Sequence, residues 1–301
     1  MNDLGARAAP RASGTACVAD VAADLARTLR NSGMAEPRRL ATDVIAALLE
    51  VPRSWPALNG DAPLDQSTVA AARTAAKRLR MGAPFAYAVG TACFRHLVLT
   101  VDERVLIPRP ETEVLVDEIF DRMRGSHGSW GTAVDIGTGS GAIALALATE
   151  GNFDRVIATD ASEDALAVAR LNCDRLSAAL RSEVEMRCGS LTSPVRGVKA
   201  AVLVSNPPYV AFAEAAGLPP SVRDWEPPIA LYSGHDGMSA TAEIVRGAAD
   251  VLIPGGLLAL EVDERRASLV AELIMSEGCY TEVGVRLDLT GRERFVLATR
   301  T

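Results

Sequence analysis

A tetrapeptide, Asn206-Pro207-Pro208-Tyr209, combines groups that suit a planar amino group. It follows a strand-like apolar run, 200–205, and ligand sites in open α/β sheets gather at the carboxyl ends of strands. The Asn206 side-chain oxygen and a carbonyl of the stiff prolines are two hydrogen-bond acceptors, and Tyr209 adds a flat apolar face. Together they would hold both hydrogens of an –NH2 group and leave its lone pair outward. Alone, the segment is equally consistent with a proline-stiffened turn.

A glycine-rich segment, 135–141, joins a strand to a helix. Its Gly-x-Gly-x-Gly pattern allows a tight turn and close approach of a ligand, but it lacks the spacing of a dinucleotide fingerprint. S-adenosylmethionine (SAM), which has no phosphate, fits this loop, and Asp135 places an acid two residues before the first glycine. Asp160 ends the next strand, where a carboxylate can accept hydrogen bonds from both ribose hydroxyls. A structural strand–helix turn remains an alternative, whereas a nucleotide oxidoreductase would leave the tetrapeptide unexplained.

Composition restricts the class of protein. The 301 residues carry a formal net charge of −7, with 49% hydrophobic and 23% charged residues, as in globular proteins. This acidity disfavours direct binding to nucleic acid. No apolar run is long enough to cross a bilayer, and residues 1–16 lack the apolar centre of a signal peptide. Five scattered cysteines without metal-ligand spacing indicate a reducing cytoplasm, no disulfide framework and no metal site.

The elements that must position these motifs fall into two domains. Apolar residues at helical spacing predict three helices between residues 18 and 79, the third capped by Asp65 or Ser67. Aromatic and β-branched residues from 84 to about 100, Tyr87 and Val89 among them, predict a β-hairpin. From residue 132 strands and helices alternate, which predicts a parallel sheet with an antiparallel hairpin at its end.

The predicted organisation is a disordered tail at 1–16, a helical substrate-docking domain at 17–83, a β-hairpin linker at 84–105 and an α/β domain at 106–301. The predicted strands are 132–136, 155–159, 184–187, 200–205, 257–262, 282–287 and 294–299, and the predicted helices begin at Gly141, Ser162, Ser239 and Arg266.

With both motifs in place, the chain resembles the HemK/PrmC family of release factor glutamine methyltransferases. The most discriminating likeness is the run 105–113, Val-Leu-Ile-Pro-Arg-Pro-Glu-Thr-Glu, because DNA amino methyltransferases share the tetrapeptide but lack this run. The same run also suits a helix start, with Pro110 in its first turn. The order of motifs matches the family from about residue 35 to the C-terminus. Further matching segments are 84–87 with Gly90, 224–227, 230–231 with 236–237, 254–257 and 288–292.

The resemblance implies a Rossmann-like, seven-stranded, SAM-dependent methyltransferase domain behind a small all-helical N-terminal domain. It implies methyl transfer from SAM to the side-chain nitrogen (N5) of the glutamine in the Gly-Gly-Gln motif of peptide chain release factors, with S-adenosylhomocysteine as product. We expect a monomer. The implied cofactor contacts are Gly137, Thr138, Gly139, Ser140, Gly141, Asp160, Leu191 and Asn206; the implied substrate contacts are Asn206, Pro207, Pro208 and Tyr209, of which Asn206, Pro207 and Tyr209 are the catalytic ones.

The sequence departs from the family pattern in two places. Ser190 and Leu191 stand where the family has an acidic and a bulky apolar residue near the adenine, which puts the adenine contact in question. Glu261-Val262-Asp263 stands where the family has a Glu-Ile-Gly-like sequence. We interpret neither position as touching the chemistry directly.

Three alternative functions share these motifs. A sister enzyme would methylate a glutamine of a ribosomal protein, and the partner choice of the helical domain cannot be inferred from the sequence. An amino methyltransferase of adenine or guanine in DNA or RNA is disfavoured by the acidity and by the lack of a second basic domain. A SAM-binding module without turnover is disfavoured by the intact Asn206 segment.

Overall fold

The computed structural model describes residues 16–125 and 128–301, which fall into two compact units divided between Val89 and Gly90. The predicted disordered tail lies outside the described residues except for Ala16. Among the residues described, no helix is both long and apolar enough to cross a membrane. The division falls at Val89, so the predicted linker is shared between the two units.

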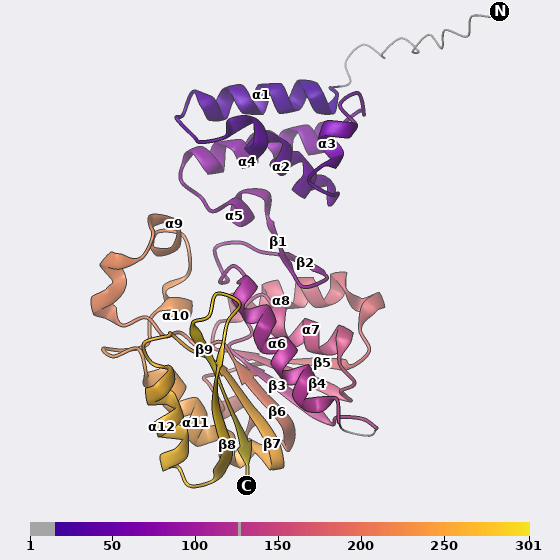
Figure 1. The fold of residues 1–301 in the computed structure, drawn as a ribbon. Helices are drawn as coiled ribbons and strands as arrows, with labels where there is room; N and C mark the ends of the chain where they lie inside the picture. The colour runs from indigo at the N-terminus through magenta and orange to yellow at the C-terminus, as the bar shows by residue number, and fades with distance from the viewer. Residues whose placement is uncertain (1–15, 126–127) are drawn as a thin grey trace, which may run out of the picture. The chain divides into compact units, whose positions relative to one another are not determined.

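The first unit is helical (Figure 1), as the sequence predicts. The apolar stripes of its long helices pack together and bury Leu25, Leu29 and Ile45 completely. Asp65 caps the last long helix by accepting a hydrogen bond from the Thr68 backbone N–H at 2.6 Å. The helices are α1 (Val18–Arg30), α2 (Pro37–Leu49), α3 (Trp55–Leu58), α4 (Gln66–Arg80) and α5 (Phe85–Val89).

The predicted hairpin from residue 84 is only partly right. Strands β1 (Thr91–Phe94) and β2 (Leu97–Thr100) form an antiparallel pair, but Tyr87 and Val89 lie on helix α5. The prediction for these two residues was wrong because burial overrides their preference for strands: both side chains are at most 8% exposed. Gly90, at φ +81°, ends the helix in a conformation that other residues avoid.

The second unit is built on a seven-stranded sheet in the order β5-β4-β3-β6-β7-β9-β8 (Figure 1). The first five strands in this order are parallel to one another. Strand β9 is antiparallel to both of its neighbours, β7 and β8, which confirms the prediction of a parallel sheet with a terminal hairpin. The strands are β3 (Thr132–Ile136), β4 (Arg155–Asp160), β5 (Glu183–Cys188), β6 (Ala200–Ser205), β7 (Leu252–Glu261), β8 (Tyr280–Leu287) and β9 (Glu293–Arg300).

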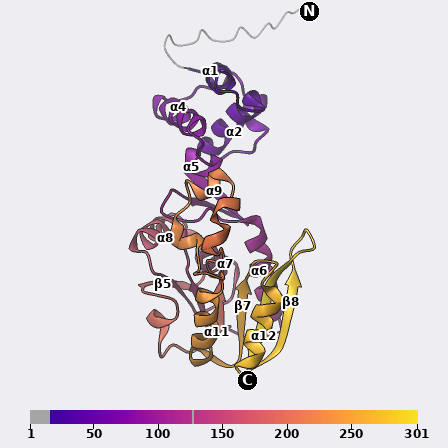
Figure 2. The ribbon, with the colours of Figure 1, turned by 90° about the vertical axis from the view of Figure 1, so that its left-hand side faces the viewer.

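Helices cover both faces of this sheet (Figure 2). Neighbouring residues in a strand point to opposite faces, so Val202 packs with the helices of one face and Leu203 with those of the other. Cys173 is half-buried and packs on the first of these faces. That face carries α6 (Pro110–Met123), α7 (Ala142–Glu150) and α8 (Glu163–Arg175), and the other carries α11 (Ser239–Val251) and α12 (Ala267–Ser276).

Strand register brings the chemical motifs to one edge of the sheet. Ile136 at the end of β3 pairs with Thr159 of β4 and with Ser205 of β6, and Ser205 pairs with Leu260 of β7. The Ser205 hydroxyl donates to the Ile136 carbonyl at 2.7 Å and ties two of these strand ends together. The residues that follow these positions are Gly137, Asp160, Asn206 and Glu261, and they therefore meet at the carboxyl edge.

Candidate active site

A cavity of about 400 Å³, which we call the larger cavity, opens at this edge of the second unit. Gly137 and Gly139 form part of its wall, and a Cβ atom built on either would meet no atom within 4 Å. Both have positive φ, at +73° and +55°, so a side chain there would also strain the backbone. The wall of the larger cavity includes Gly137, Gly139, Asp160, Ser162, Gly189, Ser190, Leu191, Asn206 and Pro208.

The glycine loop is held by backbone hydrogen bonds. The N–H groups of Gly137 and Thr138 both donate to the Thr159 carbonyl at 2.8 Å. Gly141 then caps α7 at φ +85°, where a Cβ would lie 3.0 Å from a Leu145 methyl group. The predicted strand–helix turn is therefore present, and its glycines lie where the backbone requires them.

Asp135 is buried beneath this loop at 1% exposure. Its Oδ2 accepts hydrogen bonds from the Thr138 hydroxyl at 2.7 Å and from the Ala144 N–H at 3.1 Å. Burial raises the pKa of this carboxyl to about 7. Among the described residues its Oδ1 has no hydrogen-bond partner. The hydroxyl of Thr138, a residue predicted to contact the cofactor, thus donates its hydrogen bond to Asp135.

Asp160 forms an acidic part of the wall of the larger cavity. Its Oδ2 accepts from the Gly139 N–H and its Oδ1 from the Ser162 N–H, both at 2.9 Å. Ser162 caps α8, as predicted, by accepting from the Ala165 N–H at 3.1 Å. Burial raises the pKa of the Asp160 carboxyl. Each carboxylate oxygen keeps a second lone pair, with which it could accept a hydroxyl from a ligand.

The tetrapeptide separates the larger cavity from a second one of about 180 Å³, the smaller cavity. Asn206 lines both, whereas Pro208 lines the larger cavity and Pro207 and Tyr209 line the smaller one. Burial raises the pKa of the Tyr209 phenol to about 12, so its ring stays neutral near pH 7. The smaller cavity is thus lined by an amide side chain, a tyrosine ring and one proline.

Asn206 is tied to two buried residues from distant parts of the sequence. Its Nδ2 donates to the Thr112 hydroxyl at 3.2 Å, and that hydroxyl donates to Oε2 of Glu261 at 2.7 Å. Burial raises the pKa of Glu261 to about 7. The sequence was interpreted to mean that Glu261 does not touch the chemistry directly, and its indirect link to Asn206 through Thr112 was not predicted. The available signal was an acid at the end of an apolar strand, one strand away from Asn206.

Arg109, in the wall of the smaller cavity, forms an ion pair with a buried carboxylate. Nη2 of Arg109 lies 2.7 and 2.6 Å from the two carboxylate oxygens of Glu226, whose side chain is 1% exposed. Burial raises the pKa of Glu226, and Arg109 opposes that rise. The pair joins the start of α6 to the 224–227 segment, two of the stretches on which the family resemblance rests.

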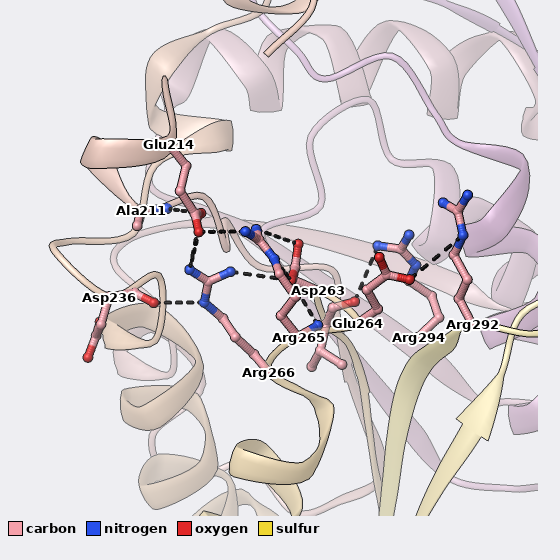
Figure 3. Close-up of polar contacts among 10 residues, drawn as sticks. Ala211, Glu214, Asp236, Asp263, Glu264, Arg265, Arg266, Arg292 and Arg294 are labelled. Atoms are coloured by element: carbon pink, nitrogen blue, oxygen red, sulfur yellow. Dashed lines mark hydrogen bonds and ion pairs between the residues drawn. The ribbon is translucent and has the colours of Figure 1, made fainter. Parts of the chain in front are cut away.

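A second polar network holds the segment that follows the tetrapeptide (Figure 3). Glu214 accepts from the Ala211 N–H at 3.1 Å and pairs with Arg266, whose Nε donates to the Asp236 carbonyl at 2.7 Å. The next residue, Gly237, packs so closely that a Cβ would lie 2.3 Å from the Tyr209 carbonyl oxygen. The segment that follows Tyr209 is therefore held by the side chain of Arg266, at the start of α12.

Most of the predicted site residues meet at the two cavities. The exceptions are Thr138, Ser140 and Gly141, which lie in the loop but outside both walls. Leu191 reaches the larger cavity in a left-handed conformation, at φ +48°, beside Ser190. Within the described residues, no three His, Cys, Asp or Glu side chains are grouped to hold a metal ion.

Comparison with known families defines the class. The model of the "Methyltransferase small domain" matches residues 111–217, and that of the "PrmC N-terminal domain" matches residues 20–90. The matched segment 111–217 contains the glycine loop, Asp160 and the tetrapeptide. The second unit is therefore the domain of a methyltransferase.

Close relatives identify the particular family. The chain is 43% identical over 223 residues to the release factor glutamine methyltransferase of Moorella thermoacetica, covering 74% of this chain and 77% of the relative. It is 37% identical over 273 residues to that of Deinococcus radiodurans, covering 90% and 94%. The chain belongs to the release factor glutamine methyltransferase family.

A solved structure supports the fold alone. The hMettl16 catalytic domain, in complex with MAT2A 3′UTR hairpin 1, superposes with a TM-score of 0.56 at 18% identity, covering 85% of this chain and 90% of that one.

Proposed function

We propose that this enzyme transfers a methyl group from SAM to the side-chain amide nitrogen of the glutamine in the Gly-Gly-Gln motif of peptide chain release factors. The observation that carries the proposal is the place of Asn206 in the walls of both cavities. An amide bound in the smaller cavity would adjoin a cofactor bound in the larger one. Membership of the family supports the same substrate.

The larger cavity fits SAM in size and in chemistry. Its volume of about 400 Å³ lies in the range of small-molecule sites. The open Cβ positions of Gly137 and Gly139 leave room for close approach, and Asp160 offers acceptors for ribose hydroxyls. Leu191 would pack on the adenine ring. When bound, SAM supplies an electrophilic methyl group on a sulfonium.

The tetrapeptide would orient the glutamine amide. The Asn206 oxygen and the Pro207 carbonyl accept the two N–H groups, and Tyr209 stacks on the amide plane. The nitrogen lone pair is then directed toward the larger cavity. Because an amide nitrogen is a weak nucleophile, this positioning carries most of the rate enhancement. Both hydrogen bonds strengthen as positive charge develops on the nitrogen, so they stabilise the transition state more than the bound substrate and lower the barrier.

The proton balance needs no side-chain base. The nitrogen gains a carbon substituent, becomes a strong acid and loses one proton to water. Tyr209 stays protonated throughout, because burial raises its pKa to about 12.

The helical first unit would dock the release factor away from the glutamine. It carries none of the residues assigned to the chemistry, and it matches the PrmC N-terminal domain over residues 20–90. Deletion of residues 1–89 should raise KM for the full-length release factor and leave SAM affinity nearly unchanged. Equal kcat/KM values for the truncated and intact enzymes would contradict docking by this unit.

The substrate assignment is tested by incubating the enzyme with labelled SAM and separate pools of release factor, ribosomal protein and transfer RNA. Label should enter the release factor pool. Label confined to ribosomal protein or to RNA would reject the proposed substrate.

A further inference from the structure

Half-buried Asn206 and two buried residues at the carboxyl edge form a chain of hydrogen bonds. Asn206, Thr112 and Glu261 come from the loop after β6, the first turn of α6 and the end of β7. The chain runs from Asn206 Nδ2 to the Thr112 hydroxyl at 3.2 Å and on to Glu261 Oε2 at 2.7 Å. Thr112 is 4% exposed and Glu261 1%, so bulk water does not compete for the bond between these two residues.

The chemistry of the groups gives this chain one direction. Above about pH 7, where Glu261 is ionised, its carboxylate can only accept, so it takes the single hydroxyl proton of Thr112. The Thr112 oxygen is then left as an acceptor, and only the NH2 end of Asn206 can donate to it. A flipped Asn206 amide would place two acceptor oxygens against each other. The oxygen of Asn206 is therefore the end of the amide that remains for a ligand.

We propose that Thr112 and Glu261 are positioning residues, which act through Asn206 by fixing its amide with the oxygen toward the substrate. The inference rests on the proposed function, in which this oxygen accepts an N–H of the substrate amide. It adds that the acceptor is pre-oriented by two residues that do not touch the substrate.

The burial of Glu261 supports a role beyond stability. Burying a carboxylate at 1% exposure is unfavourable, and the raised pKa of Glu261 reflects that cost. A neutral acceptor would hold α6 to β7 as well. The ionised form, which predominates above about pH 7, differs in being unable to donate, and this property prevents the flipped amide.

The test compares three threonine variants. Thr112→Val keeps the shape and removes the hydroxyl, and Thr112→Ser keeps the hydroxyl. Thr149→Val is the matched control, because Thr149 is also buried in the second unit but, among the described residues, its hydroxyl bonds only to carbonyls of its own helix. Each is assayed for kcat and KM with release factor and for SAM affinity by calorimetry.

We expect Thr112→Val to lower kcat about tenfold, as for loss of one oriented hydrogen bond, with SAM affinity unchanged. Thr112→Ser should stay within about twofold of the wild-type kcat, and so should Thr149→Val. A kcat for Thr112→Val equal to that of the control would overturn the proposal.

A second measurement does not depend on the substrate. In protein with ¹⁵N-labelled asparagine, the Asn206 NH2 signals are assigned by their loss in Asn206→Asp. We expect their hydrogen exchange to be slow in the wild type and at least about tenfold faster in Thr112→Val. Unchanged exchange would overturn the positioning role even if release factor proves not to be the substrate. Failure of wild-type methylation with the expected exchange result would instead reject the proposed function alone.

Discussion

The larger and the smaller cavity share Asn206, but different bonds hold their walls. Around the larger cavity, backbone groups hold the wall, since Asp160 is fixed by the N–H groups of Gly139 and Ser162. Around the smaller cavity, side chains from distant segments hold the wall, such as Thr112 on Asn206. The first arrangement follows from strand register and loop geometry. The second exists only when the whole unit is folded.

This difference predicts how each wall responds to substitution. Loss of a side chain at the larger cavity should remove one ligand contact and leave the wall in place, because backbone N–H groups hold the glycine loop and Asp160. Loss of a side chain at the smaller cavity should also misplace its neighbours, because each buried polar group depends on another. Binding of SAM and transfer of the methyl group should therefore be separable.

The largest expected effect is on transfer. Asn206→Ala removes an oriented acceptor, so kcat should fall by about 10²–10³, as for the loss of an oxyanion-hole donor, while SAM affinity changes little. Single-turnover kinetics and calorimetry measure the two quantities. Near-normal turnover in this variant would refute the role of the tetrapeptide.

A smaller effect is expected on the cofactor side. Asp160→Ala removes a charged acceptor worth roughly 1.5–3 kcal/mol, so SAM should bind about 10- to 150-fold more weakly. At saturating SAM its kcat should stay much closer to the wild-type value than that of Asn206→Ala. Unchanged affinity in calorimetry would mean that Asp160 does not contact the cofactor.

The smallest expected effect is on stability. The pKa of Glu261 is raised to about 7, so the native state prefers its protonated form. Its contribution to stability is present below the ordinary value of 4.5 and is lost as the pH rises through about 7. Glu261→Gln cannot ionise, so its unfolding free energy relative to wild type should rise between about pH 5 and about pH 8, by on the order of 2 kcal/mol. Urea unfolding at both pH values measures this; a pH-independent difference would contradict the burial cost.

Much of the larger cavity was predictable from the sequence because its parts are local. Glycine spacing, the acid after the next strand and the cap at Ser162 each reflect a short-range requirement of the backbone. The fold followed from the alternation of strands and helices for the same reason. Where burial outweighed local preference, as at Tyr87 and Val89, the prediction failed.

The supports of the smaller cavity were not predictable in this way. Thr112 and Glu261 lie 149 residues apart in sequence, and Arg109 and Glu226 lie 117 apart. No periodicity relates such positions; only the order of strands brings them together. The tetrapeptide itself could be recognised, but the groups that orient it could not.

The most direct measurement locates the methyl group. Release factor treated with the enzyme and SAM is digested, and fragmentation mass spectrometry maps the modification; a release factor with glutamate in place of the Gly-Gly-Gln glutamine is the control. We predict one added methyl group on the side-chain nitrogen of that glutamine and none on the glutamate variant, which lacks the NH2 group that the Asn206 oxygen and the Pro207 carbonyl would hold. Methylation of the glutamate variant, or of another residue in both proteins, would contradict this account.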